Sequence, residues 1–390
     1  MTHAFKVNKS MNAKTIVIMG GGIGGIVVAN KLRKAIDKSH QIVLIDKETH
    51  HLFYPSFLWV MMGWRTSSQI QKSFQLLEKK GIKFLNAEVT EINFETKTVS
   101  TSKEKVKYDY LVLALGASTF PERIDGLREN AYDIYSLEEV ARLRNDLPVF
   151  TGKLVVVLIC STPFKCPAAP YEAALLLASY FKQKGKPIEV QVVTPEQLPL
   201  PVAGPEVGKY MVSLLDAYGI KFLPEHQVQQ INPGHIQCQK GISIPFDLLL
   251  AVPPHGLPGA LKNSPILGET GWVSVDPAKL TTSLENVYAL GDVTTIPLPV
   301  GKPLPKAGVF AHAQAEVVAH NIAAHIIGSG ASKSFNGEGS CFVELGDGKA
   351  AFAKGNFYTK PAPVVLLKKP SRFRHWQKVL FEKWWLWKWF

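Results

Sequence analysis

Cysteine is scarce in this chain. The 390 residues contain four cysteines, namely Cys160, Cys166, Cys238 and Cys341. They are too few and too scattered for a secreted disulfide scaffold, and no C-x-x-C pair or histidine cluster indicates zinc. We therefore predict no metal site, and we expect any cysteine chemistry to be catalytic.

Long apolar segments are missing as well. No run of about 18 uninterrupted apolar residues is present that could cross a bilayer as a helix. The first fourteen residues carry charge but no apolar core of about seven residues, so they do not resemble a secretory signal. We expect a cytoplasmic location and no integral membrane span. A length of 390 residues suits two domains with a small appendage.

The positive charge is concentrated at the C-terminal end. The formal net charge is +12, and residues 366–390 hold seven lysines and arginines against Glu382 alone. Residues 372–390 also hold five of the eight tryptophans. On a helix, one side carries an aromatic stripe, formed by Phe373, Trp376, Leu380, Trp384 and Trp387. The other side carries polar residues, namely Arg374, His375, Lys378 and Glu382.

Tryptophans beside lysines are typical of a helix that lies in the membrane interface. We expect contacts with anionic lipid from Trp376, Trp384, Trp385 and Trp387. A soluble protein rarely leaves such an apolar patch in water. The alternatives are docking of the tail on the protein's own body or on a second subunit.

A glycine-rich turn follows the first predicted strand. The elements are, in order, strand 15–19, turn 20–25, helix 26–36 and strand 41–45. Asp46 ends the second strand, 21 residues beyond the last glycine of the turn. This spacing indicates a dinucleotide site, where Gly20, Gly22 and Gly25 let the backbone approach a pyrophosphate. Asp46 would accept from a ribose hydroxyl. A tight structural turn is the alternative.

Two later segments are apolar strands that end in glycine. They are residues 108–117 (YDYLVLALGA) and 286–292 (NVYALGD). They resemble the strands ending in A-T-G-A and G-D of two-dinucleotide-domain flavoproteins, the glutathione-reductase-like superfamily, whose Gly-Asp carboxylate holds the ribityl chain of FAD. The resemblance implies FAD, with further contacts from Lys47, Pro55, Val89, Ala114, Gly116, Gly291 and Asp292.

The same resemblance implies an α/β fold. It consists of two Rossmann-like three-layer domains of the FAD/NAD(P)-binding superfamily type, with a C-terminal membrane-interacting helical tail. We expect the FAD-binding domain in residues 12–125 and 280–328, and the second Rossmann-like domain in residues 126–279. Residues 329–390 would form the quinone site and the membrane attachment.

The second domain departs from NADH-using relatives. Its first predicted strand, residues 152–159, is followed by CSTPFKCPAAPYE rather than by a glycine turn, and no glycine occurs from residue 153 to 184. Side chains on every residue and three prolines obstruct a pyrophosphate and remove N–H donors. We predict that the NADH site is absent and that another donor reduces the flavin.

That replacement segment carries Cys166 just before a predicted helix, residues 171–182. A thiol near a helix N-terminus has a stabilised thiolate, and the neighbouring Lys165 is expected to act in the same direction. On the residues alone, a small, inert, buried cysteine is an equal alternative.

The motif C-x-x-x-P-Y-E at residues 166–172 resembles the cysteine turn of sulfide:quinone oxidoreductases and flavocytochrome c sulfide dehydrogenases. Residues 339–350 (GSCFVELGDGKA) are similar to the C-terminal cysteine segment of the same enzymes. The likeness extends from about residue 14 to 358. It implies that Cys166 and Cys341 are a catalytic redox pair beside the flavin and that Glu172 handles protons, with a plain helix-start carboxylate as the alternative for Glu172.

Two departures from the family pattern are visible. Many members have a third cysteine upstream of the turn, but residues 1–159 contain none. Histidines that some members place near the sulfide pocket have no counterpart in residues 126–136 or 199–208. The length of the sulfur product is therefore open. Cys160, Cys238 and His255 are expected to be structural.

A helix is predicted at residues 309–327, close to the place where electrons would leave the flavin. In the superfamily its start faces the flavin, where Lys306 and Ala307 would lie and the lysine would stabilise negative charge. A solvent-exposed lysine is the alternative. A membrane-bound tail favours quinone as acceptor, with aromatic residues after Cys341 as candidate contacts, namely Phe342, Phe352 and Phe357.

The resemblance thus implies a sulfide:quinone oxidoreductase, peripheral or monotopic on the cytoplasmic face of the cell membrane, with a homo-oligomer as a candidate assembly. It would oxidise hydrosulfide to sulfane sulfur or polysulfide through Cys166, Cys341 and FAD, and pass two electrons to quinone. Three alternatives stay open: a flavocytochrome c-type sulfide dehydrogenase flavoprotein, a type II NADH:quinone oxidoreductase, and a non-catalytic flavin-bound thiol sensor. No nucleic-acid partner is expected.

Overall fold

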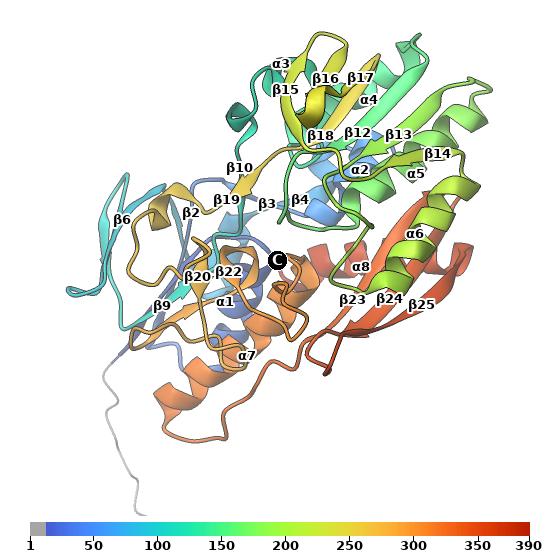
Figure 1. Cartoon of the computed structure of the whole chain (residues 1–390). Coiled ribbons are helices and arrows are strands. Elements are labelled where there is room, and N and C mark those ends of the chain that lie inside the picture. The colour runs from blue at the N-terminus through green and yellow to red at the C-terminus, as the bar shows by residue number, and fades with distance from the viewer. Residues whose placement is uncertain (1–12) are drawn as a thin grey trace, which may run out of the picture.

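The structure is a computed structural model that describes residues 13–390. Most of the N-terminal stretch in which we expect no secretory signal, and the first residue of the expected FAD-binding domain, lie outside this range. Two five-stranded parallel sheets and a three-stranded antiparallel sheet form the body (Figure 1). The predicted α/β class and Rossmann-type architecture are confirmed.

The first parallel sheet has the order β21-β9-β1-β2-β5. Its strands are β21 (Val287–Ala289), β9 (Tyr110–Leu113), β1 (Thr15–Met19), β2 (Gln41–Asp46) and β5 (Lys83–Asn86). Helices α1 (Ile23–Ala35) and α7 (Gly308–Ile327) pack against each other beside it, although they lie far apart in the sequence (Figure 1). The strands are buried on both faces, as the continuous apolar runs predict.

The second parallel sheet has the order β11-β18-β12-β13-β14. Its strands are β11 (Tyr132–Asp133), β18 (Leu248–Val252), β12 (Leu154–Ile159), β13 (Glu189–Val193) and β14 (Ile220–Leu223). The helices of this part are α3 (Leu127–Asn130), α4 (Leu137–Asp146), α5 (Ala169–Gln183) and α6 (Pro205–Ala217). Helix α5 follows β12 and begins with Pro170 in its first turn, where the missing N–H costs no helical hydrogen bond.

Smaller strands complete both halves. Three-stranded antiparallel sheets are formed by β6 (Val89–Asn93), β7 (Thr98–Thr101) and β8 (Lys105–Lys107), and by β15 (Val228–Asn232), β16 (His235–Cys238) and β17 (Ser243–Pro245). Two-stranded pairs join β3 (His50–Leu52) to β4 (Gln71–Ser73), β10 (Ser118–Thr119) to β19 (His255–Gly256), and β20 (Val273–Ser274) to β22 (Thr294–Thr295).

The C-terminal sheet carries the second candidate cysteine. It is formed by β23 (Glu338–Gly346), β24 (Lys349–Asn356) and β25 (Val364–Ser371), and Cys341 of β23 pairs with Ala353 of β24. Strand β23 packs against α5, so the sheet brings Cys341 towards the start of that helix. The hairpin turn between β23 and β24 holds Asp347 at φ 53° and Gly348 at φ 65°.

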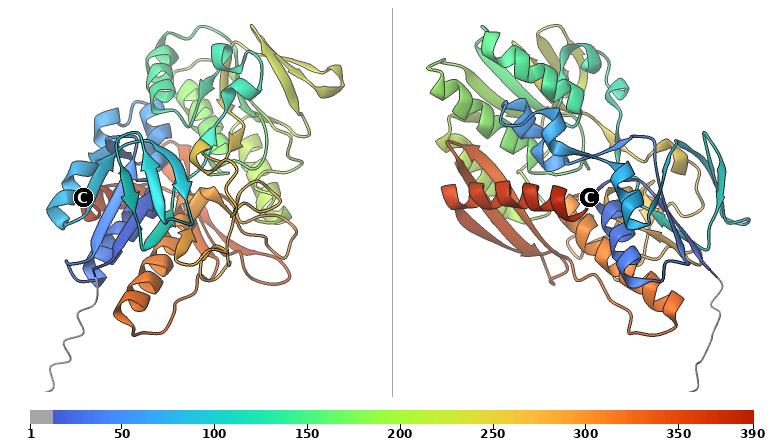
Figure 2. Two further views of the ribbon diagram at one scale, coloured as in Figure 1. Left: turned by 90° about the vertical axis from the view of Figure 1, so that its left-hand side faces the viewer. Right: turned by 180° about the vertical axis from the view of Figure 1, so that it is seen from behind.

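The last helix, α8 (Arg372–Lys388), runs across this sheet and ends beside α1 (Figure 2, right). Ser371 caps its start by accepting from the N–H of Arg374. At its far end, Asn30 of α1 donates to the carbonyl oxygen of Trp389 at 3.2 Å. Within residues 13–390, no helix combines the length and the apolar character needed to cross a bilayer. The helix therefore joins the C-terminal sheet to the glycine-turn domain.

Candidate active site

The glycine turn between β1 and α1 is built from close backbone contacts. Gly20 has φ +101°, and a Cβ there would lie 2.4 Å from the carbonyl oxygen of Ala114. A Cβ on Gly25 would lie 1.8 Å from the carbonyl oxygen of Gly20. A Cβ on Gly22 meets no atom of the described part of the chain within 4 Å. Packing thus explains Gly20 and Gly25, while Gly22 borders space that the protein does not fill.

Asp46 faces this turn from the end of β2. One carboxylate oxygen accepts from the N–H of Gly21 at 2.6 Å, and the other accepts from the N–H of Glu48 at 2.9 Å. Burial raises the pKa of Asp46. The N-terminal N–H groups of α1 have no side-chain cap, so they are available to an anion. Turn, helix start and carboxylate together have the chemistry of a dinucleotide site.

Asp292 marks a second part of the same site. It follows β21, and its Oδ1 atom is buried without a hydrogen-bond partner among residues 13–390. A buried carboxylate oxygen without a donor is costly, so this atom fits a hydroxyl group supplied by a ligand. Gln314 of α7 fixes the neighbouring turn by accepting from the N–H of Gly291 at 2.7 Å. The site therefore fits the ribityl chain and the ribose of FAD.

Lys306 is buried, which excludes a solvent-exposed lysine. Its Nζ donates to the carbonyl oxygens of Asp292 at 2.7 Å and Thr294 at 2.9 Å, and lies 3.4 Å from the centre of the Trp272 ring. Burial lowers its pKa to about 8, while Asp292 acts in the opposite direction. Ala307 precedes α7 as its N-cap residue. These residues present positive charge next to Asp292.

The remaining expected flavin contacts have different surroundings. Gly116 has φ +70°, a conformation that glycine adopts without strain. Lys47 and Pro55 are exposed, and Val89 is half-buried at the start of β6. Their contacts with FAD stay predictions.

Cys166 lies in the turn between β12 and α5, where NADH-using relatives have glycines. Its φ is 48°, an uncommon conformation for a residue with a Cβ, and such strain gathers at functional sites. Its N–H donates to the carbonyl oxygen of Lys306 at 2.6 Å, and its carbonyl oxygen accepts from the N–H of Ala169 at 2.8 Å. The turn is thereby tied both to the segment that precedes α7 and to the start of α5.

Burial of Cys166 works against the thiolate that its place before a helix predicts. Burial raises the pKa of this thiol, and Cys341 and Glu172 raise it further. Lys378 lowers the pKa of the thiol, and Lys165, whose Nζ lies 4.9 Å from the centre of the Tyr54 ring and 5.3 Å from that of Tyr135, is also close enough to interact with it. Burial is the largest of these effects.

Cys341 approaches the same place from β23. It is open to solvent on one side, but the protein around the thiol raises its pKa to about 11. Its Sγ donates to the carbonyl oxygen of Phe342 at 3.3 Å. Glu172 raises and Lys378 lowers the pKa of Cys341, and they have the same opposite effects on Cys166. Both cysteines therefore share one charged pair.

Glu172 and Lys378 form this pair. Lys378 Nζ of α8 donates to Glu172 Oε1 of α5 at 2.6 Å, and the side chains are 8% and 7% exposed. Burial raises the pKa of Glu172, although Lys378 opposes it. Burial lowers the pKa of Lys378, but Glu172 and Glu344 raise it by more. A carboxyl group with a raised pKa beside two thiols is suited to proton transfer.

His255 is buried in β19, close enough to Lys165 for that lysine to lower its pKa. Its Nδ1 is bonded to the carbonyl oxygen of Pro253 at 2.8 Å. Because a carbonyl only accepts, Nδ1 carries the proton and Nε2 is a bare acceptor, which is buried and has no partner. The ring packs edge-on against Tyr135, with centroids 5.0 Å apart.

Helix α8 presents the predicted stripe to solvent. Phe373, Trp376, Leu380, Trp384 and Trp387 are all exposed, with Trp387 at 78%. Trp385 is a correction: it is 1% exposed and packs against His51 and Phe53, so it does not reach a membrane. The inner face of the helix docks on the body of the protein, as one alternative proposed, while the stripe stays free.

The candidate quinone aromatics fall into two groups. Phe342 and Phe352 lie opposite each other on β23 and β24, with ring centroids 4.9 Å apart. Phe357 belongs to a separate cluster, 5.2 Å from the Phe310 ring. The structure does not bring Phe357 together with the other two.

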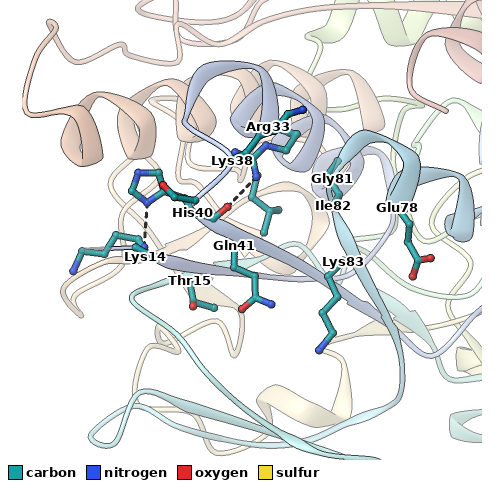
Figure 3. A pocket seen from close by; sticks show the side chains of 13 residues that line it. Lys14, Thr15, Arg33, Lys38, His40, Gln41, Glu78, Gly81, Ile82 and Lys83 are labelled. Carbon is teal, nitrogen blue, oxygen red and sulfur yellow. Dashed lines mark hydrogen bonds between the residues drawn. The ribbon is translucent and has the colours of Figure 1, made fainter. Parts of the chain in front are cut away.

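A cavity of about 640 Å³ lies away from all of these residues (Figure 3). It opens at the ends of β1, β2 and β5 opposite to the glycine turn, among Lys14, His40 and Lys83. Lys14 and Lys83 are already paired with Asp109 and Glu104. We assign no part of the site to it.

Three residues of the site were not singled out by the sequence. Glu344 lies between Val343 and Leu345 in β23, where a lone polar residue indicates a buried hydrogen-bond partner, whereas Gln314 in α7 has His312 and Glu316 close by and gave no such signal. Lys378 was placed only on the polar side of the last helix. Its spacing from Arg374 and Glu382, four residues each way, was the available signal, since charges of both signs suit ion pairs with a neighbouring surface.

The chain matches two families. The family described as pyridine nucleotide-disulphide oxidoreductase matches residues 14–157 and 173–315. The central region of the flavoprotein chain of flavocytochrome c sulfide dehydrogenase matches residues 141–198, which include Cys166 and Glu172.

Individual relatives cover almost the whole chain. It is 27% identical to the sulfide-quinone reductase of Aquifex aeolicus, over 96% of this chain and 91% of the relative. It is 23% identical to the mitochondrial sulfide:quinone oxidoreductase of Mus musculus, over 90% and 80%. The solved structure of the sulfide:quinone oxidoreductase from Aquifex aeolicus superposes with a TM-score of 0.87 at 26% identity, covering 97% of this chain and 91% of that one.

Proposed function

The chain belongs to the pyridine nucleotide-disulphide oxidoreductase family, and on this premise we propose that it is a sulfide:quinone oxidoreductase. It is an FAD-dependent oxidoreductase with the fold of that group. One observation carries the proposal: Cys166 occupies the turn where a nicotinamide site requires glycine, and Cys341 shares its charged neighbours Glu172 and Lys378. Relatives named for sulfide oxidation support the same donor.

The protein's residues would hold FAD at three places. The turn around Gly22 would hold the pyrophosphate, Asp46 the ribose, and Asp292 the ribityl chain. Lys306 would place positive charge close to the ring system. FAD, when bound, supplies the acceptor for two electrons that leave the thiols and passes them on to quinone.

The sulfur chemistry belongs to the chain itself. In the oxidised enzyme, hydrosulfide attacks one sulfur of a Cys166–Cys341 bridge, so one S–S bond forms as another breaks. The hydrosulfide sulfur is oxidised, the bridge is reduced by the same two electrons, and a persulfide and a thiolate remain. Glu172 would accept the proton that hydrosulfide carries, because its raised pKa is closer to neutral pH than that of an ordinary glutamate. A further hydrosulfide attacks the outer sulfur of the persulfide, whose S–S bond breaks to release the cysteine thiolate, and the sulfane sulfur leaves as polysulfide, the precursor of elemental sulfur.

Quinone would be reduced on the side of the protein that faces the lipid. The exposed stripe of α8 has the composition of an interfacial helix, and lysines flank its tryptophans. Docking of this stripe on the cytoplasmic face of the cell membrane would place Phe342 and Phe352 near a lipid-soluble quinone. A lipophilic acceptor is therefore favoured over a soluble cytochrome.

An anaerobic reduction experiment tests the proposal. Sulfide is added to the yellow holoenzyme, followed by a short-chain quinone, in wild type, Cys166→Ser, Cys341→Ser and the matched control Cys238→Ser, whose thiol is buried in another cluster. We expect sulfide to bleach wild type and the control, quinone to restore the colour, and both active-site variants to stay yellow. Bleaching of Cys166→Ser and Cys341→Ser at the wild-type rate would refute the roles of these cysteines.

The same experiment separates the alternatives. A type II NADH:quinone oxidoreductase would be bleached rapidly by NADH, which the glycine-free turn after β12 disfavours. The match of residues 141–198 to a flavocytochrome c sulfide dehydrogenase makes cytochrome c the second acceptor to test. Its reduction without any reduction of quinone would favour that enzyme. Reversible thiol oxidation without turnover would indicate a sensor.

A further inference from the structure

The inner face of α8 enters the cysteine site. Lys378 is the residue that reaches it, and its 2.6 Å contact with Glu172 joins positions 206 residues apart. The Lys378 ammonium also lies 5.0 Å from the centre of the Trp59 ring, which covers it from α2 (Phe57–Met61). Removing one partner of such a buried ion pair strongly destabilises a protein, because the other charge is left buried and unpaired. The helix that carries the exposed tryptophans thus also forms a wall of the site.

Contacts on both sides of Lys378 also fix the position of α8 on the body of the protein. Glu382 accepts from Ser56 Oγ at 2.6 Å and lies 2.7 Å from Arg65 Nη2. His375 Nδ1 lies 3.0 Å from Glu344 Oε2. These contacts anchor the two flanks of Lys378. They leave the Lys378 ammonium as the positive group that faces Glu172.

The charges around Cys341 have opposing effects. Glu172 on α5 raises the pKa of Cys341 and Lys378 on α8 lowers it, while Glu344 on β23 and His375 on α8 are paired behind them and the Cys166 thiol interacts with the Cys341 thiol. A carboxylate close to a thiol disfavours the thiolate, and an ammonium group favours it. As long as Glu172 is ionised, Lys378 therefore offsets its suppression of the reactive form of Cys341.

We propose that Lys378 is a positioning residue of the sulfur site: docking of the membrane-attachment helix delivers its ammonium group to Glu172 and so keeps Cys341 reactive. Its use in sulfide oxidation rests on the proposed function. The physical effect on the thiol does not. Reactivity of the cysteine thereby depends on the seating of α8.

Alkylation of Cys341 measures this effect directly. The holoenzyme with reduced thiols is treated anaerobically with iodoacetamide, without sulfide or quinone, and modification of the Cys341 peptide is followed by mass spectrometry across a range of pH. We expect Lys378→Met to slow alkylation at neutral pH by roughly three- to tenfold. Glu172→Gln should accelerate it by a similar factor, because the ammonium group then acts alone, and Lys378→Arg should restore the wild-type rate.

Glu382→Gln is the matched control, since it removes another buried ion pair of the same helix that does not face the cysteines. It lowers stability, but the pH profile of Cys341 should stay unchanged. The proposal is overturned if Lys378→Met and Glu172→Gln leave this profile at wild type or move it in the same direction. Equal slowing in Glu382→Gln would also overturn it, because the effect would then come from loosening of the helix.

The outcome is independent of the sulfide assignment. Opposite shifts in a protein that fails to oxidise sulfide would uphold the role of Lys378 and refute the proposed function. Unchanged profiles in a protein that does turn over sulfide would do the reverse.

Discussion

Trp385 donates its indole N–H to Nε2 of His51 at 3.3 Å. The other ring nitrogen of His51 is bonded to the carbonyl oxygen of Gly21 at 2.8 Å, so Nδ1 carries the proton and Nε2 accepts. Burial lowers the pKa of His51 to about 4, which keeps it neutral in this role. One histidine therefore connects the glycine turn with the C-terminal helix.

Replacing this tryptophan tests the connection. Trp385→Phe keeps the apolar packing but leaves the Nε2 atom of His51 buried without a donor, at a cost of about 1–3 kcal/mol in the free energy of unfolding. We also expect faster release of FAD, because Gly21 belongs to the turn that holds it. Chemical denaturation and flavin fluorescence measure the two effects. Trp384→Phe on the exposed face is the control, and equal losses in both variants would contradict the connection.

The glycine turn gives a second pair of variants. Gly22→Ala should fold with unchanged stability but bind FAD at least about tenfold more weakly, because its methyl group projects into space reserved for the ligand. Gly25→Ala should fail to fold correctly, since its Cβ would collide with the carbonyl oxygen of Gly20. Titration of the apoprotein with FAD and thermal unfolding separate the two. Unchanged affinity in Gly22→Ala would place the pyrophosphate elsewhere.

The exposed stripe predicts binding to membranes. Replacing Trp376, Trp384 and Trp387 together by Gln should reduce sedimentation with anionic vesicles by about tenfold or more, because the interfacial aromatic contacts are lost. Turnover with a water-soluble quinone analogue should persist. Val149→Gln, at a residue 73% exposed and distant in sequence from the tail, is the control. Full vesicle binding by the triple variant would show that the stripe covers something other than lipid.

His255 predicts a loss of stability in acid. Burial lowers its pKa to about 3 from an ordinary 6.5, so the unfolded chain takes up a proton that the folded protein refuses. Above about pH 6.5 His255 is neutral in both the folded and the unfolded chain, so it lowers no stability there. The stability of the folded protein falls as the pH drops from about 6.5 towards 3. At about pH 5 the loss is roughly 2 kcal/mol. His255→Phe should flatten this part of the stability profile, whereas His235→Phe, at an exposed position, should not.

Much of the fold and of the site could be predicted from the spacing of residues that lie close together in the sequence. The glycine turn, the strand that ends in Asp46 and the outward stripe of α8 each depend on residues within about thirty positions of one another, and the α/β class follows from their order. Periodicity identified two faces of the last helix. It did not identify which residues touch the body, so Trp385 was assigned to the wrong surroundings.

Long-range contacts explain the rest. Lys378 and Glu172 meet only because α8 crosses the C-terminal sheet, and no local pattern encodes that crossing. The burial of Cys166 could not be predicted either, because proximity to a helix start is visible in a sequence whereas depth of burial is not. The roles of the individual cysteines stay predictions that the variants above decide.

The hydrogen bond from Asn30 to Trp389 has a practical consequence for handling the protein. Because Trp389 is hydrogen-bonded to helix α1, any change that loosens the end of α8 would also disturb the helix that begins at the glycine turn. Detachment from lipid and escape of the cofactor would then occur together, and a preparation damaged in this way would look like a colourless, soluble protein.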